Sequence, residues 1–172
     1  ADVIAYGCTS GSMACPADRL LGAMEAASGR PVFSTAGAIL EALAALGVKR
    51  VAMATPYIDA TNEKEKAYIE RHGFGVTKIA GLGHGGSLEK IQKISRVSPS
   101  DAFDHVLSVD SDDADAVLIC CTDFGTADIL QPLENELGKP VLSSNSASFW
   151  AALRRSGIDE KLSGYGRLLT AH

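Results

Sequence analysis

The sequence predicts an α/β protein with parallel sheets and a site in the cleft between two related halves. Three observations lead to this prediction. Short apolar runs alternate with longer helix-like stretches, as in βαβ units. Two sets of segments recur in the same order along the chain. Each set includes a Cys-Thr pair at the expected end of a strand, at Cys8-Thr9 and at Cys121-Thr122.

The first part of the chain begins with a strand over residues 2–7, followed by hydroxyl residues that can cap a helix. That helix is expected to end near Gly29, because glycine readily adopts the left-handed conformation that closes helices. A short strand over 31–34 then leads to an Ala- and Leu-rich helix over 36–46. Gly47 ends this second helix.

The middle of the chain continues the alternation of strands and helices. Gly73 follows a charged helix and is its expected stop. The Gly-rich stretch GLGHGG is typical of a flexible loop. The expected elements are strands over 51–55 and 75–80, helices over about 59–72, 87–95 and 101–109, and the loop over 81–86.

The last part contains the run AVLICCTDFGT, residues 116–126, which changes from apolar residues to turn residues at two adjacent cysteines. Parallel strands that are buried on both faces have continuous apolar sequences, so this run predicts the central strand. Ligands bind at the carboxyl ends of such strands. The remaining expected elements are helices over 126–137 and 146–156, a strand over 140–143, and a turn-like tail over 163–167.

A repeat relates the beginning of the chain to its end. GRPVFST at 29–35 matches GKPVLSS at 138–144, and ILEALAALGV at 39–48 matches FWAALRRSGI at 149–158. The matched positions lie 109 to 113 residues apart. We therefore expect two pseudo-symmetric, Rossmann-like βαβ half-domains, each with one thiol at the end of a strand.

The repeat also predicts the domain limits. The first half-domain is expected over 1–48, the second over 49–158, and a tail over 159–172 that packs on the first half. The second half has two strand–helix units before its cysteine strand, whereas the first half has none. We therefore expect the first half to be incomplete at its start by about 60 to 70 residues. The alternative is a naturally short half-domain, which would leave a sheet edge exposed.

Composition and charge exclude several classes of protein. The 172 residues can bury a core, and the net charge is −5 with scattered basic residues, which predicts no nucleic-acid partner. No apolar segment approaches the about 20 residues of a membrane helix and no secretory signal is seen, so no membrane association is expected. Four cysteines without framework spacing favour a reducing, cytoplasmic location. The sequence leaves a homo-oligomer open.

The strand-end cysteines suggest chemistry at a single carbon atom. Across a cleft, one thiolate can attack or deprotonate one face while the other thiol donates a proton to the opposite face. Helices starting after Cys8 and Cys121 would favour the thiolates through their backbone N–H groups. The same N–H groups, with the hydroxyls of Thr9, Ser10 and Thr122, predict an anion site for a substrate carboxylate.

The other cysteines and the histidines give no sign of a metal site. The sequence has no Cys-x-x-Cys spacing and no His cluster near the cysteines, so neither a metal nor another cofactor is expected. Cys15 and Cys120 are expected to pack as small apolar residues. Alternation along the strand turns Cys120 to the face opposite Cys121.

Four motifs together resemble the aspartate/glutamate racemase superfamily, and within it the branch of maleate cis–trans isomerases and arylmalonate decarboxylases. They are YGCTSGS at 6–12, TPYIDATNE at 55–63, GKPVLSSNSASFW at 138–150 and GYGR at 164–167. The resemblance spans essentially the whole chain. It implies a cofactor-independent isomerase or racemase that acts on a small carboxylic or dicarboxylic acid, similar to maleate isomerase.

The resemblance also implies roles for individual residues. Cys8 and Cys121 match the two catalytic cysteine positions. The decarboxylases have glycine at the first of these positions, so Cys8 favours isomerisation or racemisation. The loop over 83–87 lacks the Asn expected of maleate isomerases, which leaves the substrate open. The substrate-binding positions that the resemblance implies are Thr9, Ser10, Tyr57, Thr122 and Asp123.

Several alternatives stay open at this point. The chain could be a racemase of amino acids or 2-aryl acids, a decarboxylase of the arylmalonate type, or a carboxylate-binding regulatory module without activity. Asp123 is unusual because it sets a carboxylate beside an anion site. It could cap its helix, bind a substrate amine, or raise the pKa of Cys121.

Overall fold

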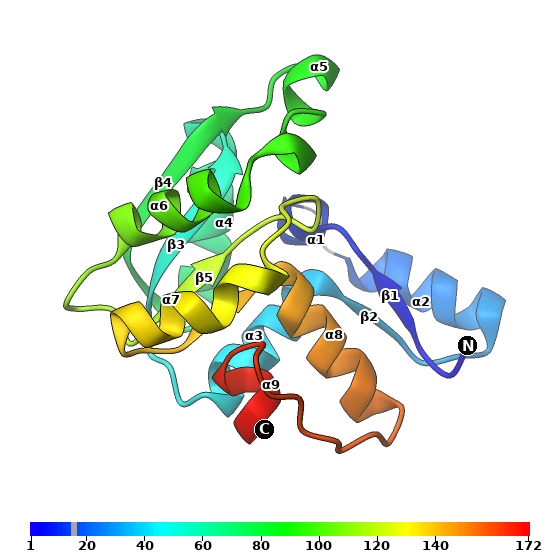
Figure 1. Ribbon diagram of the computed structural model, residues 1–172. Coiled ribbons are helices and arrows are strands. Elements are labelled where there is room, and N and C mark those ends of the chain that lie inside the picture. The colour runs from blue at the N-terminus through cyan, green and yellow to red at the C-terminus, as the bar shows by residue number, and fades with distance from the viewer. Residues whose placement is uncertain (15–16) are drawn as a thin grey trace.

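The chain folds as an α/β protein with two parallel sheets, as predicted (Figure 1). The structure, a computed structural model, describes residues 1–14 and 17–172. The packing role predicted for Cys15 therefore lies outside the described residues. The strands are β1 (Ile4–Tyr6), β2 (Val32–Ser34), β3 (Arg50–Tyr57), β4 (Gly75–His84), β5 (Ala116–Ile119) and β6 (Val141–Ser143).

The larger sheet has the strand order β4-β3-β5-β6. From β3 the chain moves outward to β4, and it then returns to the other side of β3 as β5. This reversal creates a topological switch point between the carboxyl ends of β3 and β5, where open α/β sheets bind their ligands. Tyr57 ends β3, and Cys121 lies two residues beyond the end of β5. Two predicted site residues are therefore placed at the switch point.

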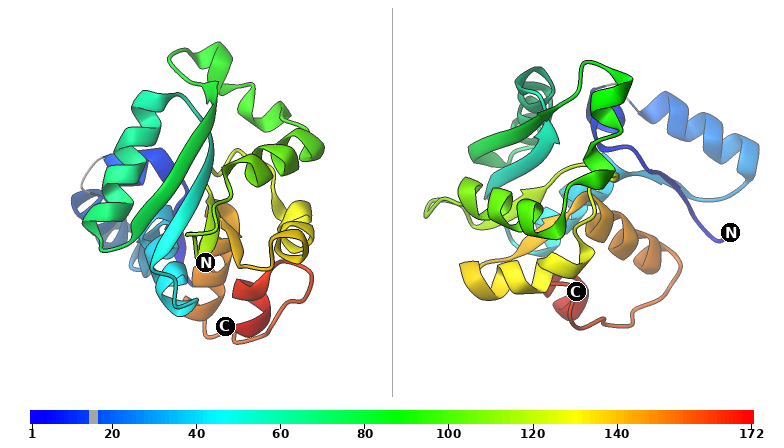
Figure 2. Two further views of the ribbon diagram at one scale, coloured as in Figure 1. Left: turned by 90° about the vertical axis from the view of Figure 1, so that its left-hand side faces the viewer. Right: turned by 45° about the horizontal axis from the view of Figure 1, so that its top comes forward.

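The helices cover the sheets and connect them. They are α1 (Thr9–Ala14), α2 (Asp18–Ser28), α3 (Thr35–Ala45), α4 (Asp59–Arg71), α5 (Leu88–Ile91), α6 (Pro99–Val109), α7 (Leu130–Leu137), α8 (Ser144–Arg155) and α9 (Arg167–Ala171), with short 3-10 turns η1 (Ile94–Arg96) and η2 (Ala127–Ile129). In Figure 2, α4 and α6 lie on opposite faces of the larger sheet. α3 and α8 pack against each other and join the two sheets. No helix in the described part of the chain is long and apolar enough to cross a membrane.

The core is centred on β3 and β5. Val51, Met53, Leu118 and Ile119 are fully buried on these two strands, and both faces of β5 are covered. Burial on both faces explains why the AVLI segment of β5 is continuously apolar rather than alternating. The prediction of a buried central strand is confirmed.

The repeat found in the sequence recurs in the strand pairing and in the helix caps. The last residue of β1 pairs with Ser34, and the last residue of β5 pairs with Ser143. Each serine then caps the helix that follows it, because its hydroxyl accepts a backbone N–H bond of 3.1 Å from the first turn of α3 or α8. Cys8 and Cys121 each lie two residues beyond the end of β1 or β5.

β4 is longer than predicted, because four of the six residues in the Gly-rich stretch over 81–86 are strand. The strand continues to His84, which pairs with Tyr57 at the end of β3. A Cβ at Gly81 would overlap the backbone carbonyl oxygen of Tyr57. Glycine is required there because the two backbones approach closely, so the prediction of a flexible loop is wrong at this residue.

The segments that follow the two cysteines also differ from the prediction. A single first helix is predicted, whereas the structure has α1 and then α2. No helix begins directly after Cys121: the chain forms a turn, and η2 precedes α7. The sequence Thr-Asp-Phe-Gly after Cys121 is rich in turn-forming residues, and turn formation prevails over a helix start.

The C-terminal tail contains α9, where only a turn is predicted. The buried Glu134 carboxylate of α7 accepts N–H bonds of 2.9 Å from Arg167 and from Val141. The Arg154 guanidinium of α8 donates a 2.8 Å bond to the carbonyl of His172. Leu168 of α9 is buried in the main core. The bonds of Arg167 and His172 attach the tail to α7 and α8 of the second half, whereas the sequence analysis expects the tail on the first half.

Candidate active site

A cavity of about 240 Å³ lies between the ends of β1, β3 and β5, and both strand-end cysteines line it. All seven site residues that the sequence predicts line this cavity. The remaining lining residues come from α4, from the end of β4, and from α5 and η1. The lining residues are Cys8, Thr9, Ser10, Tyr57, Thr61, His84, Gly85, Gly86, Ile91, Ile94, Cys121, Thr122 and Asp123.

Cys8 is partly exposed and lies between β1 and α1. Its carbonyl accepts the first bonds of α1, at 3.0 Å from the Ser12 N–H and 2.6 Å from the Ser12 hydroxyl. A Cβ at Gly11 would lie only 2.8 Å from the Cys8 sulfur and 2.9 Å from the Tyr6 hydroxyl. The glycine therefore leaves the space that the thiol occupies.

Cys121 has a very different backbone. It is 6% exposed, and its φ of 92° makes it the one non-glycine residue with positive φ in the described ranges 1–14 and 17–172. Residues held in such conformations cost on the order of 1–3 kcal/mol, and they persist only where surrounding contacts impose them. One such contact is the Cys121 N–H, which donates a 3.1 Å bond to the Ser144 hydroxyl.

The surroundings of Cys121 raise its pKa. Burial is the largest cause, and it outweighs the hydrogen bonds from the Tyr57 hydroxyl and the Asp123 N–H that favour the thiolate. The negative charges of Asp123 and Glu65 raise the pKa further. The prediction that a helix start lowers the pKa of Cys121 is therefore wrong. At neutral pH the group is a thiol, which suits a proton donor.

Tyr57 is held beside Cys121 by hydrogen bonds at the end of β3. Its N–H donates to the Thr55 hydroxyl at 3.1 Å, and that hydroxyl donates to the Asn62 side-chain oxygen of α4 at 2.5 Å. Burial, followed by the negative charge on Cys121 as a thiolate, raises the pKa of Tyr57 far above its ordinary value. Tyr57 therefore stays neutral and can donate a proton in a hydrogen bond.

Ser144 is fully buried and connects the segments that follow β1 and β5. Its hydroxyl accepts a 2.8 Å bond from the Thr9 hydroxyl as well as the bond from the Cys121 N–H. A second connection is the 3.0 Å bond from the Thr122 hydroxyl to the Gly7 carbonyl. Because both threonine hydroxyls already donate within the protein, a carboxylate in the cavity would meet the Ser10 hydroxyl and backbone N–H groups first.

The sequence does not single out Ile91 and Ile94, which line the cavity, or Ser144, which supports it from behind through its bonds to Thr9 and Cys121. The repeat could have indicated Ser144, because it aligns with Thr35, whose hydroxyl bonds the carbonyl of Tyr6 at 3.3 Å. Nothing in the sequence indicates Ile91 and Ile94. They reach the cavity only because α5 and η1 fold back over the end of the sheet (Figure 1).

Asp123 is exposed and lies in the turn after Cys121. No helix begins at this residue, so the prediction that it caps a helix is wrong. Its carboxylate lines the cavity, and its charge is one cause of the raised pKa of Cys121. The predicted electrostatic role is therefore consistent with the structure, and amine binding stays a prediction.

Cys120 does not reach the cavity. It is fully buried, as expected for a packing residue, and its thiol lies beside the Glu65 carboxyl of α4. Among the residues that the structure describes, no three His, Cys, Asp or Glu side chains gather in a way that could hold a metal ion.

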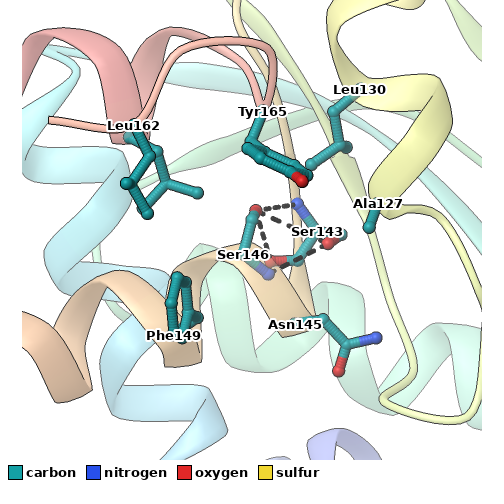
Figure 3. A pocket seen from close by; sticks show the side chains of 9 residues that line it. Ala127, Leu130, Ser143, Asn145, Ser146, Phe149, Leu162 and Tyr165 are labelled. Atoms are coloured by element: carbon teal, nitrogen blue, oxygen red, sulfur yellow. Dashed lines mark hydrogen bonds between the residues drawn. The ribbon is translucent and has the colours of Figure 1, made fainter.

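A larger cavity, of about 510 Å³, lies between α7, α8 and the tail (Figure 3). Its wall is mainly apolar, with Leu130, Phe149 and Tyr165 around the capping bonds of Ser143 and Ser146. It contains none of the cysteines, and its two serines are engaged in capping α8 while the Asn145 amide donates to the Thr122 and Phe124 carbonyls. The smaller cavity is therefore the candidate active site.

Comparison with known proteins gives a consistent result. Residues 2–169 match the protein family described as arylmalonate decarboxylase. An arylmalonate decarboxylase of Bordetella bronchiseptica is 37% identical over 149 residues, which are 85% of this chain and 60% of that protein. A maleate isomerase of Nocardia farcinica is 33% identical over 139 residues, which are 80% of this chain and 54% of that protein. The chain thus spans less than two thirds of the length of either relative.

A solved structure extends the similarity to three dimensions. It is a mutant maleate cis–trans isomerase of Nocardia farcinica with a covalently bound succinylcysteine intermediate. Its TM-score is 0.90 at 29% identity, and the match covers 99% of this chain and 72% of that chain. The predicted α/β fold is confirmed by this likeness.

Proposed function

The chain belongs to the arylmalonate decarboxylase family, and from this membership we propose that it is a cofactor-independent isomerase or racemase of a small carboxylic or dicarboxylic acid. Cys8 and Cys121 are the two reacting groups. The observation that carries the proposal is that both thiols, one from each repeat, line a single cavity. If the cysteines were only packing residues, there would be no reason for both of them to line the same cavity.

In the isomerase reaction the two thiols act in sequence on a cis double bond. The Cys8 thiolate adds to one alkene carbon, and the electron pair moves to the neighbouring carbon and its carboxylate. The Cys121 thiol then donates its proton to that neighbouring carbon. After rotation about the new single bond, the Cys121 thiolate takes the proton back, the C–S bond breaks, and the trans acid leaves with the Cys8 thiolate restored.

Two features support this division of roles. Cys121 is kept as a thiol by burial and by nearby negative charge, whereas Cys8 is partly exposed at the start of α1. The succinylcysteine intermediate of the related Nocardia isomerase is the kind of adduct that thiolate addition to maleate produces. Backbone N–H groups and the Ser10 hydroxyl would stabilise the charge that develops on the substrate carboxylate.

In the racemase alternative, one thiolate removes an α-proton and the other thiol returns a proton to the opposite face. The substrate would then be an amino acid or a 2-aryl acid. Both reactions need reduced cysteines, so we place the protein in a reducing compartment such as the cytoplasm.

Decarboxylation is a second candidate, favoured by the 37% identity with an arylmalonate decarboxylase. In this reaction the C–C bond to one carboxylate breaks, CO₂ leaves, and the electron pair stays on the α-carbon until Cys121 protonates it. Only Cys121 is needed. The test is CO₂ release from phenylmalonate, which Cys121→Ser should abolish and Cys8→Gly should spare.

The proposal is tested with maleate, aspartate, glutamate and 2-aryl acids in D₂O, followed by NMR. Formation of fumarate or exchange of an α-proton for deuterium is expected with at least one acid, and both Cys8→Ser and Cys121→Ser should abolish it. In parallel, the acid that reacts should slow alkylation of both thiols. An absence of conversion, exchange and protection with every acid would overturn the proposal.

A further inference from the structure

Asp123 contributes a carboxylate to the lining of the candidate active site, and the proposed reaction gives it no role. It lies two residues after Cys121, and its backbone N–H donates to the Cys121 sulfur. None of the ion pairs among the described residues 1–14 and 17–172 includes Asp123. An unpaired carboxylate therefore stands at the cavity in which the substrate is proposed to bind.

The turn that carries Asp123 is held on both sides of this residue. The Thr122 hydroxyl donates to the Gly7 carbonyl at 3.0 Å. The side-chain amide of Asn145 donates to the carbonyls of Thr122 and Phe124, at 3.1 and 3.4 Å. The Phe124 side chain is fully buried. The fold therefore fixes the backbone of Asp123 at the edge of the cavity, although its side chain is exposed.

The charges around the cavity are unevenly distributed. Among the described residues that line it, none is a lysine or an arginine, and the His84 ring is the nitrogen base. Lys64 lines an adjoining cavity together with Ser10. Lys93 and Arg96 line another one together with His84. Positive charge thus lies beyond these two sides of the cavity, whereas the segment that follows β5 supplies a negative charge.

This distribution suits an amino acid better than a dicarboxylate. Maleate would bring two negative charges towards a carboxylate, and like charges within about 4–6 Å destabilise each other. An α-amino acid carries one carboxylate and one ammonium group on the same carbon. Its carboxylate can accept a hydrogen bond from Ser10, on the side of Lys64, while its ammonium group donates to Asp123.

We propose that Asp123 determines the specificity of the site by binding an ammonium group on the α-carbon, so that the substrate is an α-amino acid with an uncharged side chain. The inference rests on the proposed function and selects racemisation among its reactions. The α-proton passes between the two thiols as described above, and the ammonium group stays on the carbon throughout. Ile91 and Ile94 line the same cavity and offer an apolar surface to the side chain.

The test compares two acids that differ only in the ammonium group, 2-phenylglycine and phenylacetate. Isothermal titration calorimetry at pH 7 measures the affinity of the full chain for each acid. The wild type should bind phenylglycine at least about tenfold more tightly, because hydrogen bonds between charged groups contribute more than those between neutral groups. Asp123→Asn keeps the shape and removes the charge, and it should bind the two acids about equally.

Two further variants separate a specific pair from a general effect of charge. Asp123→Glu keeps the carboxylate and should keep a preference for phenylglycine. Asp128→Asn changes an exposed carboxylate in η2 that does not line the cavity, and it should leave the preference as it is in the wild type. Weak or equal binding of the two acids by the wild type would overturn the inference. A preference that is unchanged in Asp123→Asn would overturn it as well.

Binding and turnover are measured separately, so the two proposals can fail separately. Exchange of the α-proton of phenylglycine in D₂O reports turnover. If phenylglycine binds through Asp123 and no acid reacts, the proposed function is wrong and the binding of the ammonium group stands. If maleate is converted to fumarate and phenylglycine is not preferred, the function stands and the inference is wrong.

Discussion

The two repeats each place a cysteine two residues beyond the end of a strand, but the two cysteines differ in exposure and in backbone conformation. Cys8 is partly exposed, has an ordinary backbone conformation, and leads directly into α1. Cys121 is buried, has a φ of 92°, and leads into a turn. Its surroundings keep it protonated. A duplicated framework can thus supply two identical functional groups, and local backbone and burial then give them opposite roles.

The framework shared by the repeats explains why the two cysteines stand at equivalent points. In both, the strand that carries the cysteine pairs with a strand that ends in a capping serine. These pairings fix where the chain leaves each sheet, although one sheet has two strands and the other has four. The asymmetry needed for acid–base chemistry is obtained without disturbing the sheets.

The largest expected effect is the loss of activity when either cysteine is replaced, and the reactions that are lost should differ between the two cysteines. Cys121→Gly should reduce every reaction proposed for this cavity by about 10²–10⁴-fold, because each needs its proton. Cys8→Gly should cause a similar loss of isomerisation or racemisation and leave decarboxylation intact. Progress curves by NMR with maleate and with phenylmalonate measure both. Equal loss of all reactions in the two variants would contradict different roles for the cysteines.

A second effect, of up to about 3 kcal/mol, is expected in the pH dependence of stability. The pKa of Glu65 is about 7 in the folded protein and 4.5 in its ordinary state. Below pH 4.5 the carboxyl is protonated in both states. As the pH rises from 4.5 to 7, the unfolded chain loses this proton and the folded one keeps it, so stability falls.

This loss should be absent in Glu65→Gln. Urea unfolding at pH 4.5, 6 and 8 gives the free energy of unfolding of each protein, and the variant should gain on the wild type as the pH rises. Glu63→Gln on the exposed side of α4 is the matched control. A constant difference between Glu65→Gln and the wild type across this range would show that Glu65 ionises freely when folded.

The smallest effects concern the two glycines that make room for site residues. Gly81→Ala should destabilise the protein by about 2 kcal/mol, because the new methyl group meets the backbone of Tyr57, which cannot move away. Gly11→Ala meets only the ends of the Cys8 and Tyr6 side chains and should cost less than about 1 kcal/mol. Thermal unfolding measures both. Equal losses would mean that the first repeat is as rigid as the second.

Gly11→Ala should still alter the reactivity of Cys8. The added methyl group would lie 2.8 Å from the Cys8 sulfur, so the Cys8 side chain must shift. The alkylation rate of Cys8 should change while that of Cys121 stays the same.

The sequence was informative where local pattern decides structure. The apolar run before Cys121 predicted the central strand, and the matched cysteines predicted a shared cavity. The sequence is misleading where contacts between distant segments decide the structure. Gly81 resembles a loop glycine, but it lies in β4 at a point where the backbone of β3 comes very close. Glu65 resembles a solvent-facing residue in a charged helix, and only the packing of α4 against β4, α1 and β3 buries it. Ile91 and Ile94 reach the cavity through a fold-back that leaves no local pattern.

The hydrogen bonds of Ser144 and Thr122 have a mechanical consequence. The two thiols are carried by different sheets, and their separation is set by the Thr9–Ser144 and Thr122–Gly7 contacts together with the packing of α3 on α8. The length of acid that fits between the thiols therefore depends on the stiffness of this junction as well as on the cavity wall. Substitutions at this junction would change the distance between the two thiols. They would therefore change the size of substrate that the cavity accepts, although none of the substituted residues contacts the substrate.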